Sequence, residues 1–540
     1  MMLSFKSNRS PFIARRGMVA SSQPLATQAG LSVLMGGGNA ADAAVATAAA
    51  LGVTEPYSTG LGGDCFALFY EARTGQVTAL NGSGRAPKAL SLELLKEQGL
   101  EGLPPYHAHT VTVPGTVAGW CDFLERHGTI PLAELLAPAI RLAEKGFPVA
   151  PITAHFWREF GQLKLRNNFG GPALLPNGVG PADGEIFVNK DLAHSMRLVA
   201  EGGKEAFYKG ELARKIVEAV QAAGGVMTVE DMAAHTSTWE TPISTVYRGV
   251  RVWECPPNGQ GLAALLALNV LEGFDLSGMD PLGVERWHLL IEAMRVAFAD
   301  TAWYVSDPQF FEIPVSGLLS KGYAAERRRL IDPAKAVLDR TWGVPVAGSD
   351  TVYFCVVDAA GNACSFINSI SASFGTGIVP AGLGFALHNR GAAFSTDPNH
   401  PNALAPGKRP YHTIIPGLLT READNSLYGP FGVMADFMQP QGHLQMLVNL
   451  VDDGLDPQAA LDRPRFRIEG GRASGIVLLE QGLPPVVAGQ LALMGHQVIP
   501  EVTGPLRNAK FGLGQIIRRD PNGVLWGGSD PRGDGCAMGF

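Results

Sequence analysis

The sequence lacks the features that would place the chain in a membrane or in an export pathway. Its 540 residues include no run of about 20 apolar side chains, the length that a helix needs to span a bilayer. The first residues, MMLSFKSNRSPFIARRG, carry basic side chains but no continuous apolar stretch, which is not typical of a secretory signal. We therefore expect a cytoplasmic protein that does not interact with membranes.

Cysteine is scarce, and its spacing forms no metal-binding pattern. The six cysteines are scattered along the chain without a CxxC pair. Free buried thiols in a reducing compartment are the simplest interpretation. We expect no metal site.

Runs of positive charge are almost absent. The 43 Lys and Arg residues and the 50 Asp and Glu residues are spread along the chain and leave a net charge of −7. The only basic run is Arg327-Arg328-Arg329, which we interpret as the solvated end of a helix. A nucleic-acid partner is therefore not expected.

The chain is long and rich in glycine and proline. A chain of 540 residues exceeds the size at which one ordinary core stops growing, so length alone predicts two to four domains. The 66 glycines and 38 prolines predict many tight turns and close approaches of the backbone.

The first part of the chain combines short strands with helices. Residues 36–53 carry alanine on every face, which predicts a helix buried on all sides. The segments CFALFYE and QVTALN, within residues 59–84, predict a hairpin. Helical patterns dominate residues 113–332. Residues 331–350 contain proline and glycine without a clear period, and we interpret them as an exposed linker.

The pattern changes after this linker. TVYFCVVD (351–358) and ACSFINSIS (363–371) predict two strands joined by the turn DAAGN, and residues 443–454 predict a helix. Strands on both sides of the linker, flanked by helices, predict an α+β layered fold in which helices cover two sheets.

Thr351 opens the first of these strands directly after the linker. A threonine in such a place is usually a strand residue or a turn cap. If the preceding peptide bond were cut, however, Thr351 would carry a free α-amine with a reference pKa of about 7.7–8. A base and a hydroxyl nucleophile would then belong to one residue, with the base close to its optimum for proton transfer. The β-branched side chain would also limit the rotamers of the hydroxyl.

Seven segments together resemble the γ-glutamyltranspeptidase family of N-terminal-nucleophile hydrolases. The segment at Thr351 resembles the family's nucleophile segment, and the others occur in the family's order, so that the resemblance extends from about residue 17 to 532. They are GGNAADAAVA (37–46), LGGDCF (61–66), VPGTVAGW (113–120), GSDTVYFCVVDAAGNACSFINS…FGTGIV (348–379), GKRPYHTIIP (407–416), QGHLQMLVNLVDDG (441–454) and GGSDPR (527–532).

The resemblance implies a four-layer αββα sandwich and no cofactor. It implies that the precursor cuts itself between Asp350 and Thr351 into a large subunit, 1–350, and a small subunit, 351–540, which share one core. It also implies an acyl-enzyme on the Thr351 hydroxyl, resolved by water or by an acceptor amine.

One departure from the family pattern concerns the substrate carboxylate. In γ-glutamyl-transferring members an arginine shortly before an Ala-Pro pair holds the α-carboxylate. Here the pair is Ala86-Pro87, and the matching position is Ser83. Arg85 stands two residues later, and it either takes over this role with shifted geometry or forms a surface ion pair.

The side chains that hold the substrate α-amine also differ. The matching positions are Ser371, Arg390 and Ala393, and we add Ser369 as a candidate substrate-binding residue. An arginine in place of a neutral amide, with the carboxylate lost, predicts a pocket that suits an anion and repels an ammonium group. The alternative is that Arg390 only pairs with a structural carboxylate.

Two further substitutions affect the same pocket. His412 and Thr413 replace a serine pair that assists carboxylate binding, and both can still donate hydrogen bonds. Ala435 and Asp436 replace the Gly-Gly pair whose backbone N–H groups form the oxyanion hole. A positive φ would be strained at these residues, and the Asp436 carboxylate would oppose an oxyanion unless it points away or is neutralised, for example by Arg390. One lost oxyanion donor costs roughly 10²–10³ in rate.

The first hypothesis is a self-cleaving amide hydrolase of this family that acts on a small carboxylate-bearing substrate. The features GSGRAP, DTVYF and QPQGH resemble the branch that contains oxamate amidohydrolases and glutathione-hydrolase-like proenzymes. The alternatives are oxamate hydrolysis specifically, glutathione hydrolysis or γ-glutamyl transfer, and a glutaryl-type acylase activity. A catalytically inactive relic of the fold is the hypothesis from a different class.

Overall fold

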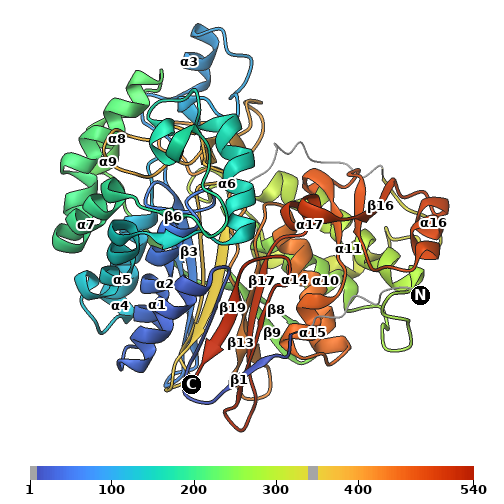
Figure 1. Cartoon of the computed structure of the whole chain (residues 1–540). Helices are drawn as coiled ribbons and strands as arrows, with labels where there is room; N and C mark the ends of the chain where they lie inside the picture. Colours follow the sequence, from blue (N-terminus) through green and yellow to red (C-terminus); the bar gives the residue numbers. More distant parts are fainter. Residues whose placement is uncertain (1–8, 339–350) are drawn as a thin grey trace.

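Two seven-stranded sheets face each other in the computed structural model, which describes residues 9–338 and 351–540 (Figure 1). The first sheet has the order β1 (Phe12–Ala14), β18 (Leu525–Ser529), β17 (Gly514–Arg519), β13 (Leu427–Val433), β12 (Gly417–Arg421), β9 (Val250–Glu254) and β8 (Ile243–Tyr247). The second has the order β19 (Cys536–Gly539), β2 (Met18–Ser21), β10 (Val352–Val357), β11 (Ala363–Ser369), β3 (Asp64–Glu71), β4 (Gln76–Asn81) and β7 (Thr238–Glu240). Both sheets take strands from both sides of residues 339–350, which explains why the long chain forms one sandwich rather than several domains.

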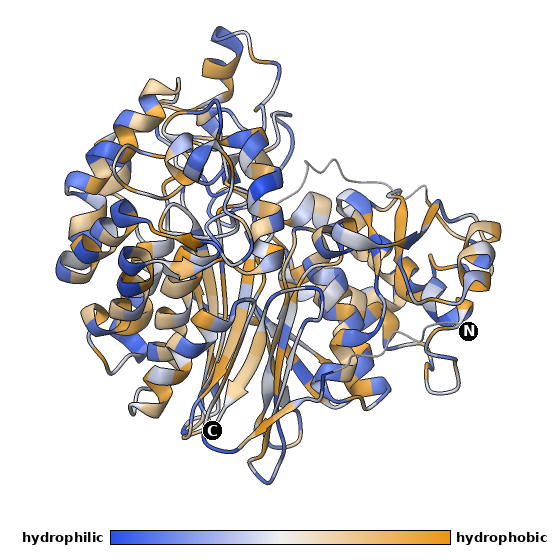
Figure 2. Ribbon diagram, in the orientation of Figure 1, coloured by the Kyte–Doolittle hydropathy of each residue, from blue (hydrophilic) through white to orange (hydrophobic). Residues whose placement is uncertain are grey.

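Helices cover the outer face of each sheet, as the predicted αββα layering requires (Figure 1). The second sheet is covered by α1 (Pro24–Met35), α2 (Ala40–Thr54) and α4 (Thr116–His127), with α5 (Leu132–Lys145) packed on α2. The first sheet is covered by α10 (Gly261–Leu271), α14 (Met438–Leu447) and α15 (Pro457–Asp462), with α11 (Val284–Tyr304) packed on α10. In Figure 2 the outer helices mix hydrophilic and hydrophobic residues, whereas the central strands are largely hydrophobic.

The alternation of side chains along β10 explains why this strand lies between two cores. Val352, Phe354 and Val356 belong to the core beneath the α2 layer. Tyr353 and its alternate neighbours belong to the core shared with the other sheet. Because successive side chains of a strand point to opposite faces, a fully apolar strand suits a sheet that is covered on both sides.

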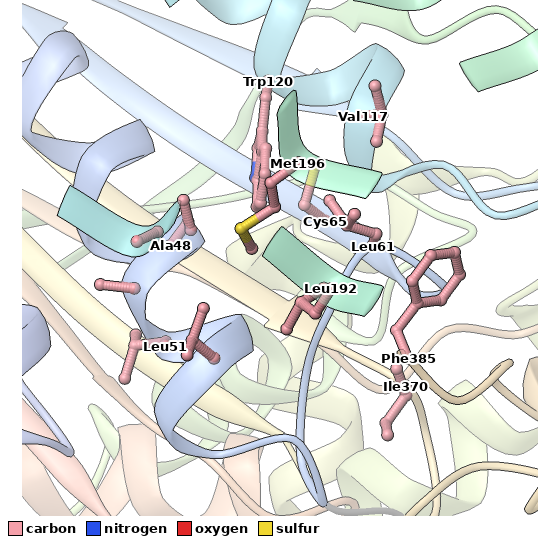
Figure 3. Close-up of a cluster of buried hydrophobic side chains, with 14 of the residues drawn as sticks. Ala48, Leu51, Leu61, Cys65, Val117, Trp120, Leu192, Met196, Ile370 and Phe385 are labelled. Atoms are coloured by element: carbon pink, nitrogen blue, oxygen red, sulfur yellow. The ribbon is translucent and has the colours of Figure 1, made fainter. Parts of the chain in front are cut away.

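The helix predicted to be buried on all sides is α2, and all of its residues are buried. Its start is fixed by a capping box, in which Asn39 accepts hydrogen bonds from the backbone of Ala41 and Asp42 while the Asp42 carboxylate accepts one from the Asn39 N–H at 2.9 Å. Figure 3 shows Ala48 and Leu51 of this helix in a cluster with Trp120 and, from α7 (Lys190–Tyr208), Met196.

The other local predictions were largely confirmed. The hairpin is β3–β4, with antiparallel pairing from Phe66 opposite Asn81 to Glu71 opposite Gln76. The helix predicted at 443–454 is α14 continued by a π-helical turn, Val448–Asp452. Residues 331–338 form neither helix nor strand, and the rest of the predicted linker, Asp350 included, lies outside the described residues.

The basic run at 327–329 was interpreted wrongly as simply solvated. It does end a helix, α13 (Lys321–Arg328). However, Arg327 forms a 2.7 Å ion pair with Asp300, and Arg328 donates hydrogen bonds to the carbonyls of Val270 and Asn269 at 2.7 and 3.0 Å. These carbonyls lie at the C-terminal end of α10, where a helix attracts positive charge.

Two expectations about absent features can be compared with the described residues. None of the helices resolved in 9–338 and 351–540 is both long and apolar enough to cross a membrane. The six cysteines all fall in these ranges, and each is a free thiol.

Candidate active site

The register of three neighbouring strands brings the first site residues together. Val352 lies opposite Asn368 in the β10–β11 pair, so Thr351 comes next to Ser369, and Ser369 lies opposite Asp64 of β3. The hydroxyl oxygens of Thr351 and Ser369 are 3.1 Å apart and hydrogen-bonded, and both residues are fully buried.

Ser369 orients the candidate nucleophile. Its Oγ accepts hydrogen bonds from the Ser371 backbone N–H at 2.9 Å and from Arg390 Nη2 at 3.1 Å. In the bond between the Thr351 and Ser369 hydroxyls, either oxygen can be the donor. Ser371 itself has a φ of 71°, which turns the chain away after β11.

Arg390 begins a short 3₁₀ helix (Arg390–Ala393) and is almost fully buried. Its Nη1 donates a 2.8 Å hydrogen bond to the Thr413 hydroxyl, and its Nη2 donates the bond to Ser369. Burial lowers its pKa to about 10, while the carboxylates of Asp64 and Asp436 raise it. The guanidinium is therefore charged at neutral pH, and it has more N–H donors than these two hydroxyls occupy.

Asp64 is the buried counter-charge of Arg390. Its Oδ2 lies 3.9 Å from Arg390 Nε, 3.1 Å from His412 Nε2 and 3.4 Å from His388 Nδ1, and its Oδ1 accepts a 3.2 Å hydrogen bond from the Gly84 N–H. Burial raises the pKa of this carboxyl, but the positive and N–H-donating side chains around it lower the pKa more, so it falls below its ordinary value.

His412 serves this carboxylate rather than a substrate in the described arrangement. Burial, together with the positive charge of Arg390, lowers the pKa of His412 to about 3. The imidazole is therefore neutral and donates its Nε2–H to Asp64. Arg390 thus pairs with a structural carboxylate and also faces open space.

That space is a cavity of about 420 Å³. Four of its polar wall residues are predicted site residues, namely Ser371, Arg390, Thr413 and Asp436. The apolar part of the wall includes Leu103, Phe394, Tyr411 and Phe437. A cavity of this size is in the range that proteins use to bind small molecules.

Arg85 is not among the described residues that line this cavity. It is partly exposed and donates a 3.4 Å hydrogen bond to Gln309. Nearby, the carbonyl of Ser83 accepts a 3.0 Å hydrogen bond from another arginine, Arg409. The structure therefore links Thr351 by successive hydrogen bonds to Ser369, Arg390 and Thr413, and leaves Arg85 outside this group.

Ala435 and Asp436 adopt the positive φ angles that a Gly-Gly pair would favour, 90° and 51°. The strain anticipated from the sequence is thus present in the backbone. The Gln260 side-chain amide donates to the Asp436 carbonyl at 3.0 Å, and the Met438 N–H donates to the Ala435 carbonyl at 2.8 Å. These bonds hold the turn just before α14.

The Asp436 carboxylate is buried and only loosely paired. Burial raises its pKa to about 6, against the lowering effects of Arg467 and Arg390. Its Oδ2 lies 3.5 Å from Arg467 Nη2. Arg467, which was not anticipated from the sequence, makes this contact, whereas Arg390 acts on the carboxyl only through its charge.

Sequence reasoning missed Asp64, His388 and Arg467. Asp64 offered a signal, because it is a charged residue at the start of the apolar run DCFALFYE, inside a segment already identified as family-like. His388 and Arg467 stand in ordinary local contexts, and only their positions in the folded chain show their roles.

Comparisons with known proteins find relatives over nearly the whole chain. The family model described as Gamma-glutamyltranspeptidase matches residues 26–540. A glutathione hydrolase-like proenzyme of Bacillus subtilis (strain 168) is 38% identical over 532 residues, which cover 98% of this chain and 99% of that protein. An oxamate amidohydrolase proenzyme of Klebsiella pneumoniae is 34% identical over 537 residues, which cover 98% and 99%.

A solved structure has the same fold over the whole chain. The cephalosporin acylase from Bacillus halodurans superposes with a TM-score of 0.90 at 46% sequence identity, covering 99% of this chain and 98% of that one. A family match across nearly the full length, joined to this αββα architecture, shows that the chain belongs to the gamma-glutamyltranspeptidase family of N-terminal-nucleophile hydrolases.

Proposed function

We propose that the chain cuts itself between Asp350 and Thr351 and that Thr351 then hydrolyses an amide in a small carboxylate-bearing substrate. The observation that carries this proposal is the hydrogen-bonded line from Thr351 through Ser369 to Arg390. It places a candidate nucleophile one hydroxyl away from a buried cation that borders a cavity.

In the proposed self-cleavage, Thr351 Oγ1 attacks the carbonyl carbon of Asp350. The C–N bond breaks, an ester to the Thr351 side chain forms, and the released nitrogen takes up the hydroxyl proton. Water then hydrolyses the ester, which gives the Asp350 carboxylate and the free α-amine of Thr351. The fragments 1–350 and 351–540 stay together because both sheets combine strands from both fragments.

The amidase cycle uses the same oxygen with a new base. The α-amine of Thr351 takes the hydroxyl proton as Oγ1 attacks the substrate carbonyl, and it passes that proton to the leaving amine. The backbone N–H groups of Ala435 and Asp436 are the proposed donors to the oxyanion. Water then attacks the acyl-threonine ester and releases a carboxylic acid and the regenerated hydroxyl.

Arg390 favours a substrate with a carboxylate on its acyl part. A guanidinium that borders a cavity recognises carboxylates through paired N–H donors. The volume of the cavity and its aromatic wall exceed what oxamate, a carboxylate next to an amide, would fill. We therefore propose glutaryl-type amides as the preferred substrates and oxamate as a poor one. The likeness to a cephalosporin acylase supports an acylase activity of this kind.

Self-cleavage is tested on a denaturing gel. We expect two fragments from the purified wild-type chain, with N-terminal sequencing of the smaller one beginning at Thr351. Thr351→Ala should remain intact and lose all amidase activity, whereas Thr351→Ser, which keeps a hydroxyl, should still be processed. An intact wild-type chain indistinguishable from Thr351→Ala would contradict the proposal and favour the inactive relic.

A substrate panel tests the amidase activity. It comprises glutaryl, pentanoyl and γ-glutamyl p-nitroanilides, oxamate and glutathione, each with and without a dipeptide acceptor. We expect the glutaryl anilide to be hydrolysed fastest and the acceptor to add little. Preferred turnover of the γ-glutamyl anilide or glutathione would show that the site accepts an ammonium group after all.

A further inference from the structure

The groups that hold Arg390 in place differ from the group that balances its charge. Its position is set by two hydroxyl acceptors, Thr413 at 2.8 Å and Ser369 at 3.1 Å. Its Nε lies 3.9 Å from Asp64 Oδ2 and makes no hydrogen bond within the part of the chain that the structure describes. Asp64 therefore balances the guanidinium charge across a gap and does not hold the group in place.

Asp64 is in turn held in place without Arg390. The Gly84 backbone N–H donates to one carboxylate oxygen, and His412 Nε2 donates to the other. Asp64 is fully buried, and its backbone lies opposite Ser369 in the β3–β11 pair. The carboxylate is thus a permanent negative charge beside the site.

From this separation we propose that Asp64 sets how strongly Arg390 binds a substrate carboxylate. The inference rests on the proposed function, because it presumes that a carboxylate binds at Arg390. A bound substrate anion shares the guanidinium with Asp64 and is repelled by it. Asp64 therefore makes the substrate carboxylate bind more weakly than it would to a buried arginine without a counter-charge. The same holds for the product that retains this carboxylate.

The same charge acts on the nucleophile. Thr351 is linked to Arg390 through the single hydroxyl of Ser369. In the processed enzyme a nearby cation disfavours the protonated α-amine, and Asp64 offsets that effect. The other charged or titratable groups around this point include His388, His412, Asp436 and Cys65, with Arg409 and His235 farther out.

Asp64→Asn removes the charge while preserving the shape of the side chain. Its amide oxygen can still accept from the Gly84 N–H. We expect the KM for glutaryl p-nitroanilide and the inhibition constant of glutarate to fall about ten-fold, because the repulsion between two carboxylates is lost. The KM for pentanoyl p-nitroanilide, which has the same chain length without a carboxylate, should not change.

The pH dependence of kcat/KM is a second test, because a purely structural role of Asp64 would leave it unchanged. Without Asp64 the α-amine of Thr351 loses a stabilising negative charge in its protonated form, so its pKa falls. The acid limb of kcat/KM should shift to lower pH by about one unit on both substrates. An unchanged or raised KM for the glutaryl anilide, or an unshifted acid limb, would overturn the inference.

A second variant keeps the test decisive if Asp64→Asn folds poorly. Asp64→Asn combined with Arg390→Met removes both buried charges together. Because Asp64 repels the substrate carboxylate directly, the double variant should prefer glutaryl over pentanoyl p-nitroanilide more than Arg390→Met alone does. Equal preferences in these two variants would contradict the inference.

Different results would contradict the proposed function and the inference about Asp64. The proposed function fails if the wild type is not cut or hydrolyses none of the anilides. The inference fails if the wild type is cut and active but the preference for glutaryl over pentanoyl is the same with and without the Asp64 charge.

Discussion

Two parts of the candidate site hold buried charge in opposite ways. One is the Arg390 wall, formed by Asp64, Ser369, Arg390 and Thr413, where a cation is hydrogen-bonded to two hydroxyls and balanced by a carboxylate. The other is the 435–436 turn, where a buried carboxyl has a raised pKa and two non-glycine residues have positive φ angles. In the wall, Asp64 balances the charge of Arg390 before any substrate binds, whereas the turn has a strained backbone.

The side chain of Gln260 connects these two parts. Its amide Nε2 donates to the carbonyl of Thr413 at 2.6 Å and to the carbonyl of Asp436 at 3.0 Å. Strained backbone of this kind costs of the order of 1–3 kcal/mol per residue and persists where the surroundings over-determine it. We propose that the wall selects the substrate, while the turn keeps a backbone conformation that is unfavourable for its residues.

The largest effect is expected from removing the charge of Arg390 from the wall. Arg390→Met keeps most of the side-chain volume and removes the charge. We expect kcat/KM for glutaryl p-nitroanilide to fall about 100-fold, because a buried charge that binds an anion is lost, with little change for the pentanoyl anilide. Self-cleavage on a denaturing gel should persist.

Arg85→Met is the matched control. This arginine contacts Gln309 outside the cavity, so the preference for the glutaryl substrate should not change. Equal losses on both anilides in Arg390→Met would assign that arginine a structural role only.

An intermediate effect is expected from neutralising the turn. Burial raises the pKa of Asp436 in the folded chain to about 6, above its value in the unfolded chain. The folded state therefore binds this proton more tightly, and the stability associated with it is present at low pH and lost as the pH rises through about 6. Asp436→Asn should raise the free energy of unfolding by about 1–3 kcal/mol at pH 7.5 and change it little at pH 4.

Denaturant unfolding at both pH values measures this difference. Asp424→Asn, in an exposed turn, serves as the control and should show no such gain. A variant of Asp436 that is less stable than the wild type at pH 7.5 would show that the ion pair with Arg467 outweighs the burial of the carboxyl.

The smallest effect is expected from relieving the backbone of the turn. Ala435 has a φ of 90°, which glycine adopts without a steric cost. Ala435→Gly should therefore stabilise the protein by about 1 kcal/mol, seen as a modest rise in melting temperature. Ala460→Gly, within the helix α15, should have the opposite sign and cost about 1 kcal/mol. If both substitutions destabilise alike, the turn at Ala435 is not strained.

Much of the fold could be predicted because its signals are local. Apolar strands at 351–358 and 363–371, and the alanine-rich helix at 36–53, follow from patterns within one segment. The need for positive φ at Ala435 and Asp436 was likewise anticipated from the motif that they replace. Chain order then placed Thr351 at the head of a central strand.

The charge partners could not be predicted in the same way. Arg85 was a candidate because it stands near the Ala86-Pro87 pair, but two residues of extended chain cover about 7 Å, too far to replace a side chain at Ser83. Asp64 and Arg390 are distant in sequence. The β11–β3 pair places Asp64 opposite Ser369, and Arg390 reaches Ser369 by a hydrogen bond from a separate segment. The 3.5 Å approach of Arg467 to Asp436 likewise depends on how separate segments pack.

The sequence by itself thus determined the layers, because periodicity acts over a few neighbouring residues. Its resemblance to the family indicated Thr351 as the candidate nucleophile and Ala435 and Asp436 as residues in an unfavourable backbone. The tertiary structure decided which of two arginines borders the cavity and which carboxylate balances it. Charge interactions depend on distance through space, and those distances exist only after the strands have paired and the sheets have packed.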